Sequence, residues 1–346
     1  MNEIIIISIP IFLILLTLEA YVSYKKKKNF YKLKDSLGNL GTGIINQLIE
    51  VFTKAALILL YIYVYEHFAI GLKLWSDNFL TLHGFVSWVI VFILTDFIYY
   101  FFHRHSHEIN LFWAAHMVHH SSEEYNFSVA LRQSGISGVL NWVYALVLAL
   151  MGVPAHMYFI CYGLNLIYQF FIHTRFVGKL GFLEKILNTP SHHRVHHARQ
   201  SKYLDSNYSG IFIIWDRLFG TFIEEEEEPR YGVYPRFQSY DPVRANLMPY
   251  SELYYYVKKA KGWDKGRVLF SGPLWLYDHF KKDQKLNVLE NKIAADIPSF
   301  LLFIFALAFG VIILFVPALT LAVKAGIMLI VFSLLTMMGK RLDRQA

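Results

Sequence analysis

Long apolar stretches alternate with short basic and histidine-rich segments along the chain. The first, residues 4–21, is followed at once by four lysines at 25–28, whereas a secretory signal peptide carries its basic residues before the apolar run. Two further stretches, 43–70 and 84–102, are each long enough to cross a bilayer, because about 20 helical residues span the hydrocarbon core. We therefore predict three membrane-spanning helices, the first of which ends at a lysine cluster on the cytosolic side.

Two longer apolar runs are each broken in the middle by a proline. Residues 137–172 contain Gly-Val-Pro ending at Pro154, and residues 297–338 contain Val-Pro-Ala around Pro317. Proline ends or kinks a helix, so each run predicts two helices that turn back on each other. With these crossings, every basic cluster falls on one side of the membrane, as the positive-inside rule requires. The pattern predicts an all-α integral membrane protein built as a multi-pass helical bundle.

Composition agrees with this pattern. Hydrophobic residues make up 55% of the 346 residues and charged residues 17%, where a soluble domain carries about a quarter charged residues. Such a composition excludes a disordered chain and a coiled coil, and the single cysteine, Cys161, excludes an intrachain disulfide. We attribute the net charge of +7 to basic loops that face anionic lipid headgroups, rather than to nucleic-acid binding.

The chain divides into four expected parts. These are N-terminal transmembrane helices (1–83), a histidine-rich domain (84–240), a cytosolic segment (241–295) and a C-terminal transmembrane hairpin (296–346). Residues 198–296 mix charged residues, prolines and tyrosines, which is typical of a cytosolic cap on a membrane bundle. Within that cap, we interpret the acidic run 224–228 as a solvated loop rather than a binding site.

Histidines are concentrated in one part of the chain. Eleven of the fifteen lie between His103 and His197, all on the predicted cytosolic side. Eight of these form three boxes, H-x3-H followed by two copies of H-x2-H-H: His103 and His107; His116, His119 and His120; His193, His196 and His197. Residues at i, i+3 and i+4 share one helical face, so each box can direct several imidazoles to a common point. Neutral imidazoles that converge from rigid helices are typical metal ligands.

The number of histidines restricts the kind of metal site. Eight ligands are too many for one zinc ion or for the two axial positions of a haem. Ferritin-like di-iron sites use Glu-x-x-His pairs, and Glu108, Glu123, Glu124 and Glu184 all lack a histidine three residues later. We therefore predict two metal ions bound almost wholly by nitrogen. Imidazole suits iron, copper and zinc, so the spacing leaves the element open, and a histidine-lined pH switch is the alternative to metal binding.

These boxes resemble those of the fatty acid hydroxylase/sterol desaturase superfamily of membrane non-haem di-iron oxygenases. Further stretches carry the likeness, which covers roughly residues 90–240: DFIYY at 96–100, HMVHHSSEEYNFSVALRQS at 116–134, YQFFIHT ending at Thr174, NTPSHHRVHHARQ at 188–200 and WDRLFGTF at 215–222. Within the superfamily, the sequence is most similar to the members that cleave ether lipids. The domain at 84–240 is accordingly expected to be the catalytic one, with its di-metal centre in a cytosolic histidine-rich cap.

The resemblance implies a set of site residues. The eight box histidines match the metal ligands of the family, and His173 matches an additional histidine that the family places near the metals. Supporting residues that would orient the imidazole N–H groups are expected at His192, Asp96, Glu108, Asn126, Arg132, Asn207 and Asp216. His105 faces away from the stripe formed by His103 and His107, and we expect it at the surface or behind the ligands.

The resemblance also implies a reaction. Two iron ions would activate O2 and hydroxylate an aliphatic C–H bond of a lipid. In an O-alkyl ether lipid the attacked carbon lies beside the ether oxygen, and the product collapses to a fatty aldehyde and a glycerol derivative. The sequence has no G-x-G-x-x-G nucleotide fingerprint, so electrons are expected from an external reductant, either tetrahydrobiopterin or a separate redox protein.

Other functions stay open at this point. Sterol or fatty acid hydroxylases and desaturases share the three boxes, and a histidine-lined metal transporter is a more distant alternative. A transporter is expected to place polar residues at the bilayer midplane, whereas these histidines follow the ends of predicted spans. We expect the boxes on the cytosolic side of the endoplasmic reticulum in a eukaryote, or of the plasma membrane in a bacterium.

Overall fold

The computed structural model describes residues 2–70, 74–234, 239–281 and 295–344. The part of the expected cytosolic segment that runs over 282–294 lies outside these residues. Within them there is no β-strand, only two isolated bridges, Leu187 with Phe212 and Ala198 with Tyr231. The helices are α1 (Asn2–Lys25), α2 (Leu33–Phe68), α3 (Leu82–Glu108), α4 (Asn110–His120), α5 (Phe127–Ala130), α6 (Ser137–Leu150), α7 (Ala155–Ile172), η1 (Gly181–Lys185), α8 (Pro190–His196), α9 (Ile214–Phe219), α10 (Pro242–Lys259), α11 (Asp264–Phe270), α12 (Pro273–Leu276), η2 (Tyr277–Lys281), α13 (Ile297–Phe315) and α14 (Leu321–Arg344).

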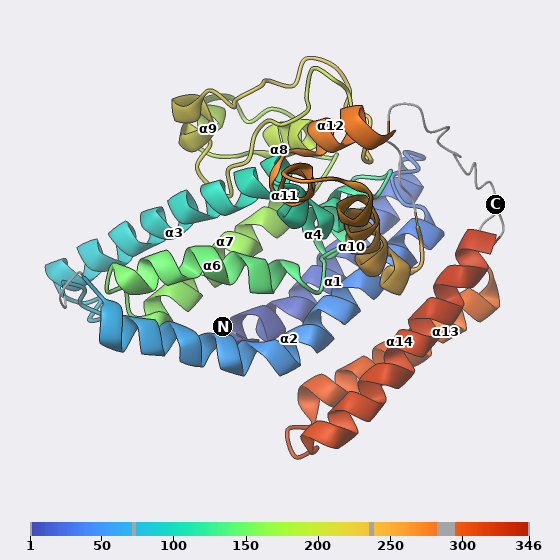
Figure 1. Cartoon of the computed structure of the whole chain (residues 1–346), viewed down its shortest axis with the longest axis horizontal. Coiled ribbons are helices and arrows are strands. Elements are labelled where there is room, and N and C mark those ends of the chain that lie inside the picture. Colours follow the sequence, from blue (N-terminus) through green and yellow to red (C-terminus); the bar gives the residue numbers. More distant parts are fainter. Residues whose placement is uncertain (1, 71–73, 235–238, 282–294, 345–346) are drawn as a thin grey trace.

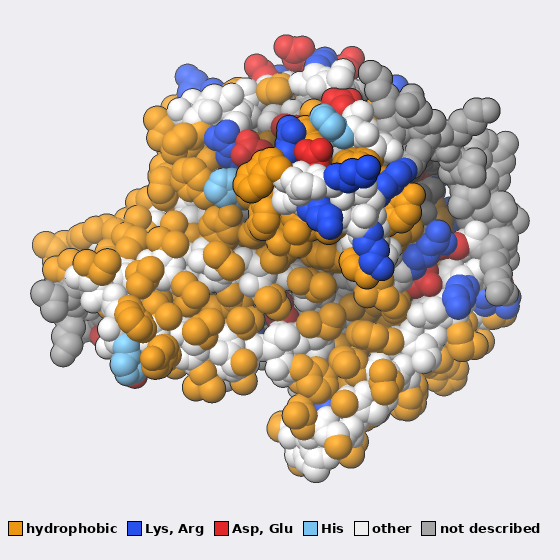
Figure 2. Space-filling view, viewed as in Figure 1, with side chains coloured by type: hydrophobic (Ala, Val, Ile, Leu, Met, Phe, Trp, Pro, Cys, Tyr) orange, Lys and Arg blue, Asp and Glu red, His pale blue; other side chains and the backbone are white. Residues whose placement is uncertain are grey.

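Long apolar helices dominate the fold, as the hydrophobic pattern predicted. In the described part of the chain, α2, α3, α13 and α14 are long and apolar enough to cross a membrane, and α6 is a shorter apolar helix. Helices α1 and α7 occupy predicted positions but are not among those four. Figure 2 shows apolar side chains covering the bundle, while charged side chains gather over the cap. The all-α, multi-pass membrane architecture is therefore confirmed.

Both proline breaks occur where the sequence predicts them. Gly152 takes a positive φ of 76° between α6 and α7, and Pro154 precedes the first residue of α7. The fully buried Tyr61 of α2 donates a hydrogen bond to the carbonyl of Val153 (3.0 Å) and stacks on Tyr158 (5.4 Å between ring centroids). The turn is thus attached to the C-terminal part of α2. The second break separates α13 from α14, which lie side by side in Figure 1.

Helix α2 begins ten residues earlier than the predicted span at 43–70. Its first turns carry polar side chains that are buried against the segment after the second histidine box. Asn39 donates to Asp35 (2.8 Å), and Asp35 also accepts from Ser122 (2.7 Å). The guanidinium of Arg132 donates to the side-chain oxygen of Asn39 (3.1 Å). Because these polar groups pair inside the protein, the helix extends beyond its apolar part and holds the loop that follows α4.

The cap lies along one side of the bundle and is formed by α8 to α12 (Figure 1). Helix α10 joins it to the C-terminal hairpin: a core of Leu37, Leu48, Phe303 and Leu335 packs α2 against α13 and α14, and Tyr240, just before α10, belongs to the same core. Gly339 allows the closest approach, since a Cβ atom there would lie 2.1 Å from the Cα of Asp241.

We expect Gly339→Ala to lower the free energy of unfolding by about 3 kcal/mol, because the added methyl group meets backbone that no side-chain rotation can move. Gly326→Ala in the same helix is the matched control, since nothing lies within 4 Å of its Cβ position. The control should be neutral or slightly stabilising, by up to about 1 kcal/mol. Thermal unfolding of the two variants in detergent checks this expectation, and equal melting temperatures would contradict the packing of α14 on α10.

Candidate metal centre

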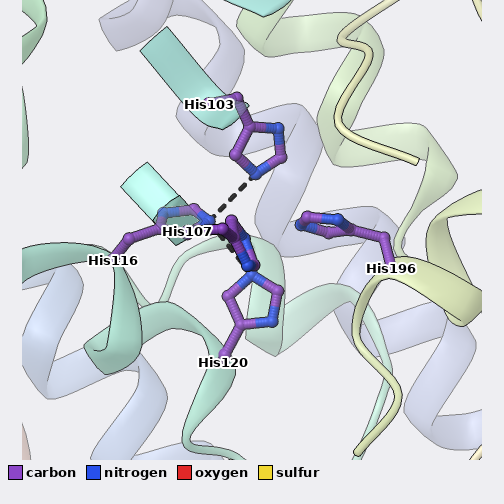
Figure 3. A group of neighbouring side chains, drawn as sticks. All are labelled: His103, His107, His116, His120 and His196. Atoms are coloured by element: carbon purple, nitrogen blue, oxygen red, sulfur yellow. Dashed lines mark hydrogen bonds between the residues drawn. The ribbon is translucent and has the colours of Figure 1, made fainter. Parts of the chain in front are cut away.

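Nine histidine side chains converge where α3, α4, α8 and the end of α7 meet. They form two groups, and within each group the nitrogens that can act as ligands all lie within 4.8 Å of one another. We call the first the five-histidine cluster: His103, His107, His116, His120 and His196 (Figure 3). We call the second the four-histidine cluster: His119, His173, His193 and His197. The structure therefore brings together all nine histidines that the sequence singled out as candidate ligands.

Each H-x2-H-H box is divided between the two clusters. In α4, His116 and His120 are one helical turn apart and point into the five-histidine cluster, whereas His119 points into the four-histidine cluster. The third box, at His193–His197, does the reverse. Its outer pair joins the four-histidine cluster, and its middle residue, His196, joins the five-histidine cluster. Neighbouring residues of a helix point about 100° apart, so a helix that lies between the clusters serves both. The clusters adjoin, with the His120 and His197 rings stacked at 4.2 Å.

Backbone carbonyls hold four of the imidazoles in place. In each case Nδ1–H donates to a carbonyl oxygen, which leaves Nε2 unprotonated and directed into a cluster. The four bonds run from His103 to Tyr208 (2.6 Å), from His196 to Ser206 (2.9 Å), from His119 to Arg132 (3.0 Å) and from His173 to Gln169 (2.6 Å). Each cluster thus contains two histidines of fixed orientation.

The resulting arrangement of nitrogens suits a cation. Nε2 of His119 and Nε2 of His173 lie 3.3 Å apart, and both carry lone pairs because their protons are on Nδ1. Two imidazole nitrogens bound to one ion at about 2.0–2.1 Å lie roughly 3 Å apart, so the spacing fits a shared metal. Buried ring nitrogens without a hydrogen-bond partner are found in both clusters, at His107 Nε2, His193 Nδ1, His196 Nε2 and His197 Nε2. Buried polar atoms are normally paired.

Burial keeps these imidazoles uncharged. It lowers the pKa of His119 to about 4 and that of His196 to about 3, because the imidazolium form loses its hydration inside the protein. At neutral pH the two side chains are therefore neutral, which is the form that binds metal ions.

Aromatic side chains form the wall around the clusters. Trp113 packs against the ring of His107 at 5.1 Å, and Tyr208 lies on the same histidine at 5.3 Å. Tyr125 stacks on His173 at 5.5 Å with the planes 21° apart. Tyr125 and Tyr208 are completely buried. The clusters thus lie in a space from which large apolar rings exclude water.

Asp216 organises the loop that supplies two of the orienting carbonyls. Its carboxylate accepts hydrogen bonds from the backbone N–H groups of Tyr208 (2.8 Å) and Ser209 (2.9 Å) and from the hydroxyl of Thr221 (2.7 Å). The residue is fully buried. Asp216 therefore acts on His103 through the Tyr208 backbone, rather than by bonding an imidazole itself.

Asp96 and Asn207 support the same loop. Asp96, buried in α3, accepts from the backbone N–H groups of Ile211 (2.8 Å) and Phe212 (3.0 Å). Asn207 has a φ of 55°, a left-handed conformation that asparagine tolerates. Its side-chain amide donates to the carbonyls of His192 (3.0 Å) and Ile223 (2.8 Å). Both residues therefore hold backbone, and neither side chain bonds an imidazole.

The remaining supporting residues were also expected to orient imidazole N–H groups, but their side chains bond other groups. Glu108 accepts from the side chain of Arg104 one turn earlier (2.8 Å), and Asn126 caps α5. His192 caps the first turn of α8. Arg132 does orient His119, but through its backbone carbonyl, while its guanidinium binds other groups. These polar residues lie near the boxes because they end helices or fix loops.

His105 lies outside both clusters, as its helical position predicted. Its Nδ1 is 2.7 Å from the hydroxyl of Tyr144. Tyr144 is neither a candidate ligand nor one of the aromatic residues around the clusters.

The acidic run at 224–228 does more than form a solvated loop. Glu225 binds the guanidinium of Arg194 through both oxygens (2.8 and 2.6 Å), and its side chain is only 15% exposed. Arg194 lies inside the third box and also donates to the carbonyls of Thr174 (3.1 Å) and Val177 (2.7 Å). This pair joins α8 to the residues just after His173. The sequence interpretation, which used charge alone, missed this ion pair because Glu225 lies 31 positions from Arg194 in the sequence.

Comparison with known proteins agrees with the family resemblance found in the sequence. Residues 88–221 match the model of the family described as Fatty acid hydroxylase. The chain is 38% identical over 268 residues to alkylglycerol monooxygenase from Homo sapiens and 38% identical over 268 residues to alkylglycerol monooxygenase from Danio rerio. Each match covers 77% of this chain and 58% of the relative, so the chain spans less than two thirds of the length of these relatives.

A more distant relative acts on another lipid. The chain is 26% identical over 139 residues to ornithine lipid hydroxylase OlsE from Rhizobium tropici, a match that covers 39% of this chain and 41% of the relative. No solved structure gives a significant match.

We expect Asp216→Asn to loosen the loop that orients His103 and His196, because an amide cannot accept all the bonds that the carboxylate accepts. The loss of buried charge-assisted hydrogen bonds lowers the free energy of unfolding by about 2–3 kcal/mol. Hydrogen–deuterium exchange should show faster exchange at residues 206–212. Asp264→Asn, at an exposed aspartate, is the matched control, and equal exchange in both variants would show that Asp216 does not hold the loop.

Proposed function

We propose that this chain is an iron-dependent membrane monooxygenase of the fatty acid hydroxylase family, because residues 88–221 match the model of that family. It hydroxylates an aliphatic C–H bond of a lipid with O2. The observation that carries this proposal is the convergence of nine histidines, several with unpaired ring nitrogens, in two adjoining clusters.

The proposed centre holds two iron ions, one in each cluster. Imidazole nitrogen is a suitable ligand for iron, and the facing nitrogens of His119 and His173 support a cation between them. The five-histidine cluster would bind one ion and the four-histidine cluster the other, so that all nine histidines are ligands. Because the clusters contain no carboxylate, this donor set differs from that of ferritin-like di-iron proteins.

The iron supplies the activation of O2 that hydroxylation of an unactivated C–H bond requires. The chain supplies fixed ligands and a dry environment. The carbonyls of Tyr208 and Ser206 keep Nε2 of His103 and His196 directed inward. The rings of Trp113 and Tyr125 keep water from the clusters, which protects a reactive site from side reactions.

We propose an O-alkyl ether lipid as the substrate. One atom of O2 enters the C–H bond beside the ether oxygen, and the other leaves as water after uptake of two electrons and two protons from the reductant. The product is a hemiacetal, which breaks its C–O bond to give a fatty aldehyde and a free glycerol hydroxyl. Support comes from the relatives named alkylglycerol monooxygenase, which match over most of this chain.

A second candidate is simple hydroxylation of another lipid. The relative named ornithine lipid hydroxylase favours it, and sterol or fatty acid hydroxylation and desaturation belong to the same class. In these reactions the oxidised lipid does not break apart, so the products distinguish this candidate from ether cleavage.

The electrons come, in this proposal, from a separate reductant, with tetrahydrobiopterin the first to test and a redox protein the alternative. A polar pocket of about 400 Å³ suits the approach of a small molecule; its wall includes Arg175, Arg199 and Tyr231. Tyr231 stacks on Tyr125 at 5.0 Å, and Tyr125 stacks on His173 at 5.5 Å. A molecule in this pocket would therefore be separated from the four-histidine cluster by two rings.

The proposed location is a membrane, with the histidine clusters on the cytosolic side of the endoplasmic reticulum or of the bacterial plasma membrane. Four apolar helices support the membrane assignment, and the lysine cluster at 25–28 supports the orientation. We also propose residues 84–240 as the catalytic domain, between the transmembrane helices at 1–83 and the cytosolic segment at 241–295, with 296–346 as the hairpin.

We predict that His116→Ala and His193→Ala each reduce the metal content from two ions per chain towards one, because each variant removes a ligand from a different cluster. His105→Ala is the matched control and should retain both ions, since its ring bonds Tyr144 instead. Elemental analysis of the purified full chain provides the measurement. Full metal content in both cluster variants, or loss in the control, would contradict the assignment of ligands.

Incubation of the iron-loaded protein with an alkylglycerol, tetrahydrobiopterin and O2 should yield a fatty aldehyde. We expect an aldehyde from the alkylglycerol alone, because only an ether substrate gives a hemiacetal that collapses, and we expect a sterol or an ornithine lipid to be left unoxidised if the ether lipid is the substrate. Mass spectrometry of the extracted lipids separates the two outcomes. Hydroxylation of the sterol or ornithine lipid with an intact alkylglycerol would favour the second candidate instead.

A further inference from the structure

Two short elements, η1 and α9 of the cap, expose an unusual amount of apolar surface. Phe182 of η1 is 69% exposed and Leu218 of α9 is 67% exposed. Further exposed apolar side chains surround them, and together we call these residues the η1–α9 surface: Leu180, Phe182, Leu183, Ile186, Ile214, Leu218 and Phe219. Large contiguous apolar patches on a protein normally mark a contact with another molecule or with a membrane.

The two elements form one unit. Leu187, just after η1, bridges to Phe212, just before α9, and the N–H of Ile213 donates to the carbonyl of Ile186 (3.0 Å). Arg217 of α9 reaches back to the carbonyl of Glu184 (3.2 Å). The apolar side chains therefore lie on a single folded surface rather than on two independent loops.

This unit packs on the membrane-spanning helix α3. Trp215 lies on Phe97 at 4.9 Å, and Phe212 lies on Phe92 at 6.1 Å. The indole N–H of Trp215 also donates to the buried Asp96 (2.9 Å). In Figure 1, α9 accordingly lies beside the second half of α3 and not beyond its end.

The position along α3 gives the depth of the contact. At 1.5 Å per residue, Phe97 lies about 22 Å from the start of α3 at Leu82. A hydrocarbon layer of about 30 Å that starts at that end extends past Phe97. The neighbouring part of the cap is then level with lipid rather than with the cytosol.

The η1–α9 surface also continues a face of α3 that already meets lipid. Apolar side chains of α3 between Phe85 and Ile93 are exposed, by 47% and 38% at the two ends of this face. Beyond Ile93, α9 covers the helix at Phe97. Figure 2 shows the apolar side chains along α3 reaching the part of the cap beside α9. The exposed apolar face of α3 and the η1–α9 surface thus follow each other along α3.

Basic residues border the surface. Lys185 ends η1 and Arg217 belongs to α9. Their long side chains lie over apolar rings, at 5.9 Å from Phe182 and 3.8 Å from Phe222. Cations beside an apolar patch complement the anionic headgroups of a cytosolic leaflet.

We propose that the η1–α9 surface is embedded in the cytosolic leaflet of the membrane, as a second lipid contact in addition to the spanning helices. The lipid bilayer is its partner, through acyl chains at Phe182 and Leu218 and through anionic headgroups at Lys185 and Arg217. This inference does not depend on which lipid is oxidised.

The embedded surface has a consequence for the metal centre. The segment 206–212, whose carbonyls orient His103 and His196, leads directly into α9. Asp96 holds the end of that segment against α3. The bilayer therefore steadies the same stretch of chain that directs two imidazoles into the five-histidine cluster.

Site-directed spin labelling tests this inference. The labels are placed at Leu218→Cys and Phe182→Cys in the full chain with Cys161→Ser, reconstituted in bilayers of phosphatidylcholine and phosphatidylglycerol. Ile90→Cys on the exposed face of α3 is the lipid control, and Glu226→Cys, 75% exposed in the cap, is the aqueous control. Power saturation compares the access of O2, which concentrates in lipid, with that of a water-soluble nickel chelate.

We expect the labels at 218 and 182 to shift towards the Ile90 control, with greater access to O2 than to the nickel chelate. Labels at both positions that behave like Glu226→Cys would overturn the proposal. Labels that neither reagent reaches would also overturn it, because a second copy of the chain or another protein would then cover the surface. Both substituted side chains are exposed, so the variants should fold, and thermal unfolding checks that they do.

Discussion

Where two imidazole nitrogens that both carry lone pairs face each other at 3.3 Å, as those of His119 and His173 do, their repulsion is relieved by a cation between them. The same requirement applies to the unpaired ring nitrogens elsewhere in the two clusters. Protonation is a poor alternative, because burial disfavours the charged form of these side chains. The arrangement of the nine histidines therefore suits metal ions better than protons, and the rest of the structure keeps these side chains together.

The fold meets this requirement with few elements. Helices α4 and α8 each lie between the clusters and serve both, which explains why each carries three histidines in the pattern H-x2-H-H. The long helix α3 brings His103 and His107 to the end of a membrane span. Backbone carbonyls then set the orientation of four rings, and the loop that provides two of them is held by Asp216 and Asp96. The clusters thus lie at the end of the span formed by α3.

Much of this organisation could be predicted from the sequence. Apolar stretches and proline breaks located the helices, since burial in lipid requires continuous apolar surface. Helical spacing identified the box histidines, and the family resemblance added His173. The division of each box between two clusters was not predicted, because it depends on where the helices lie relative to each other. The orienting carbonyls were also missed, since every residue has one and no side chain marks those that matter.

The roles of the supporting residues also could not be predicted from the sequence. Asp96, Asn207 and Asp216 were expected to orient imidazoles, and the structure instead shows them bonded to backbone. A buried carboxylate close to a box in sequence looks the same whether it binds an imidazole or a row of N–H groups. Tertiary contacts decide between these roles, as with Glu225 and Arg194, which are separated by 31 positions.

Mössbauer spectroscopy of the full chain purified from cells grown on iron-57 tests the central claim most directly. We predict about two iron ions per chain, as a magnetically coupled pair, because the two clusters adjoin and would hold their ions close to each other. A single uncoupled iron, or stoichiometric zinc in place of iron, would contradict a di-iron centre built from these nine histidines.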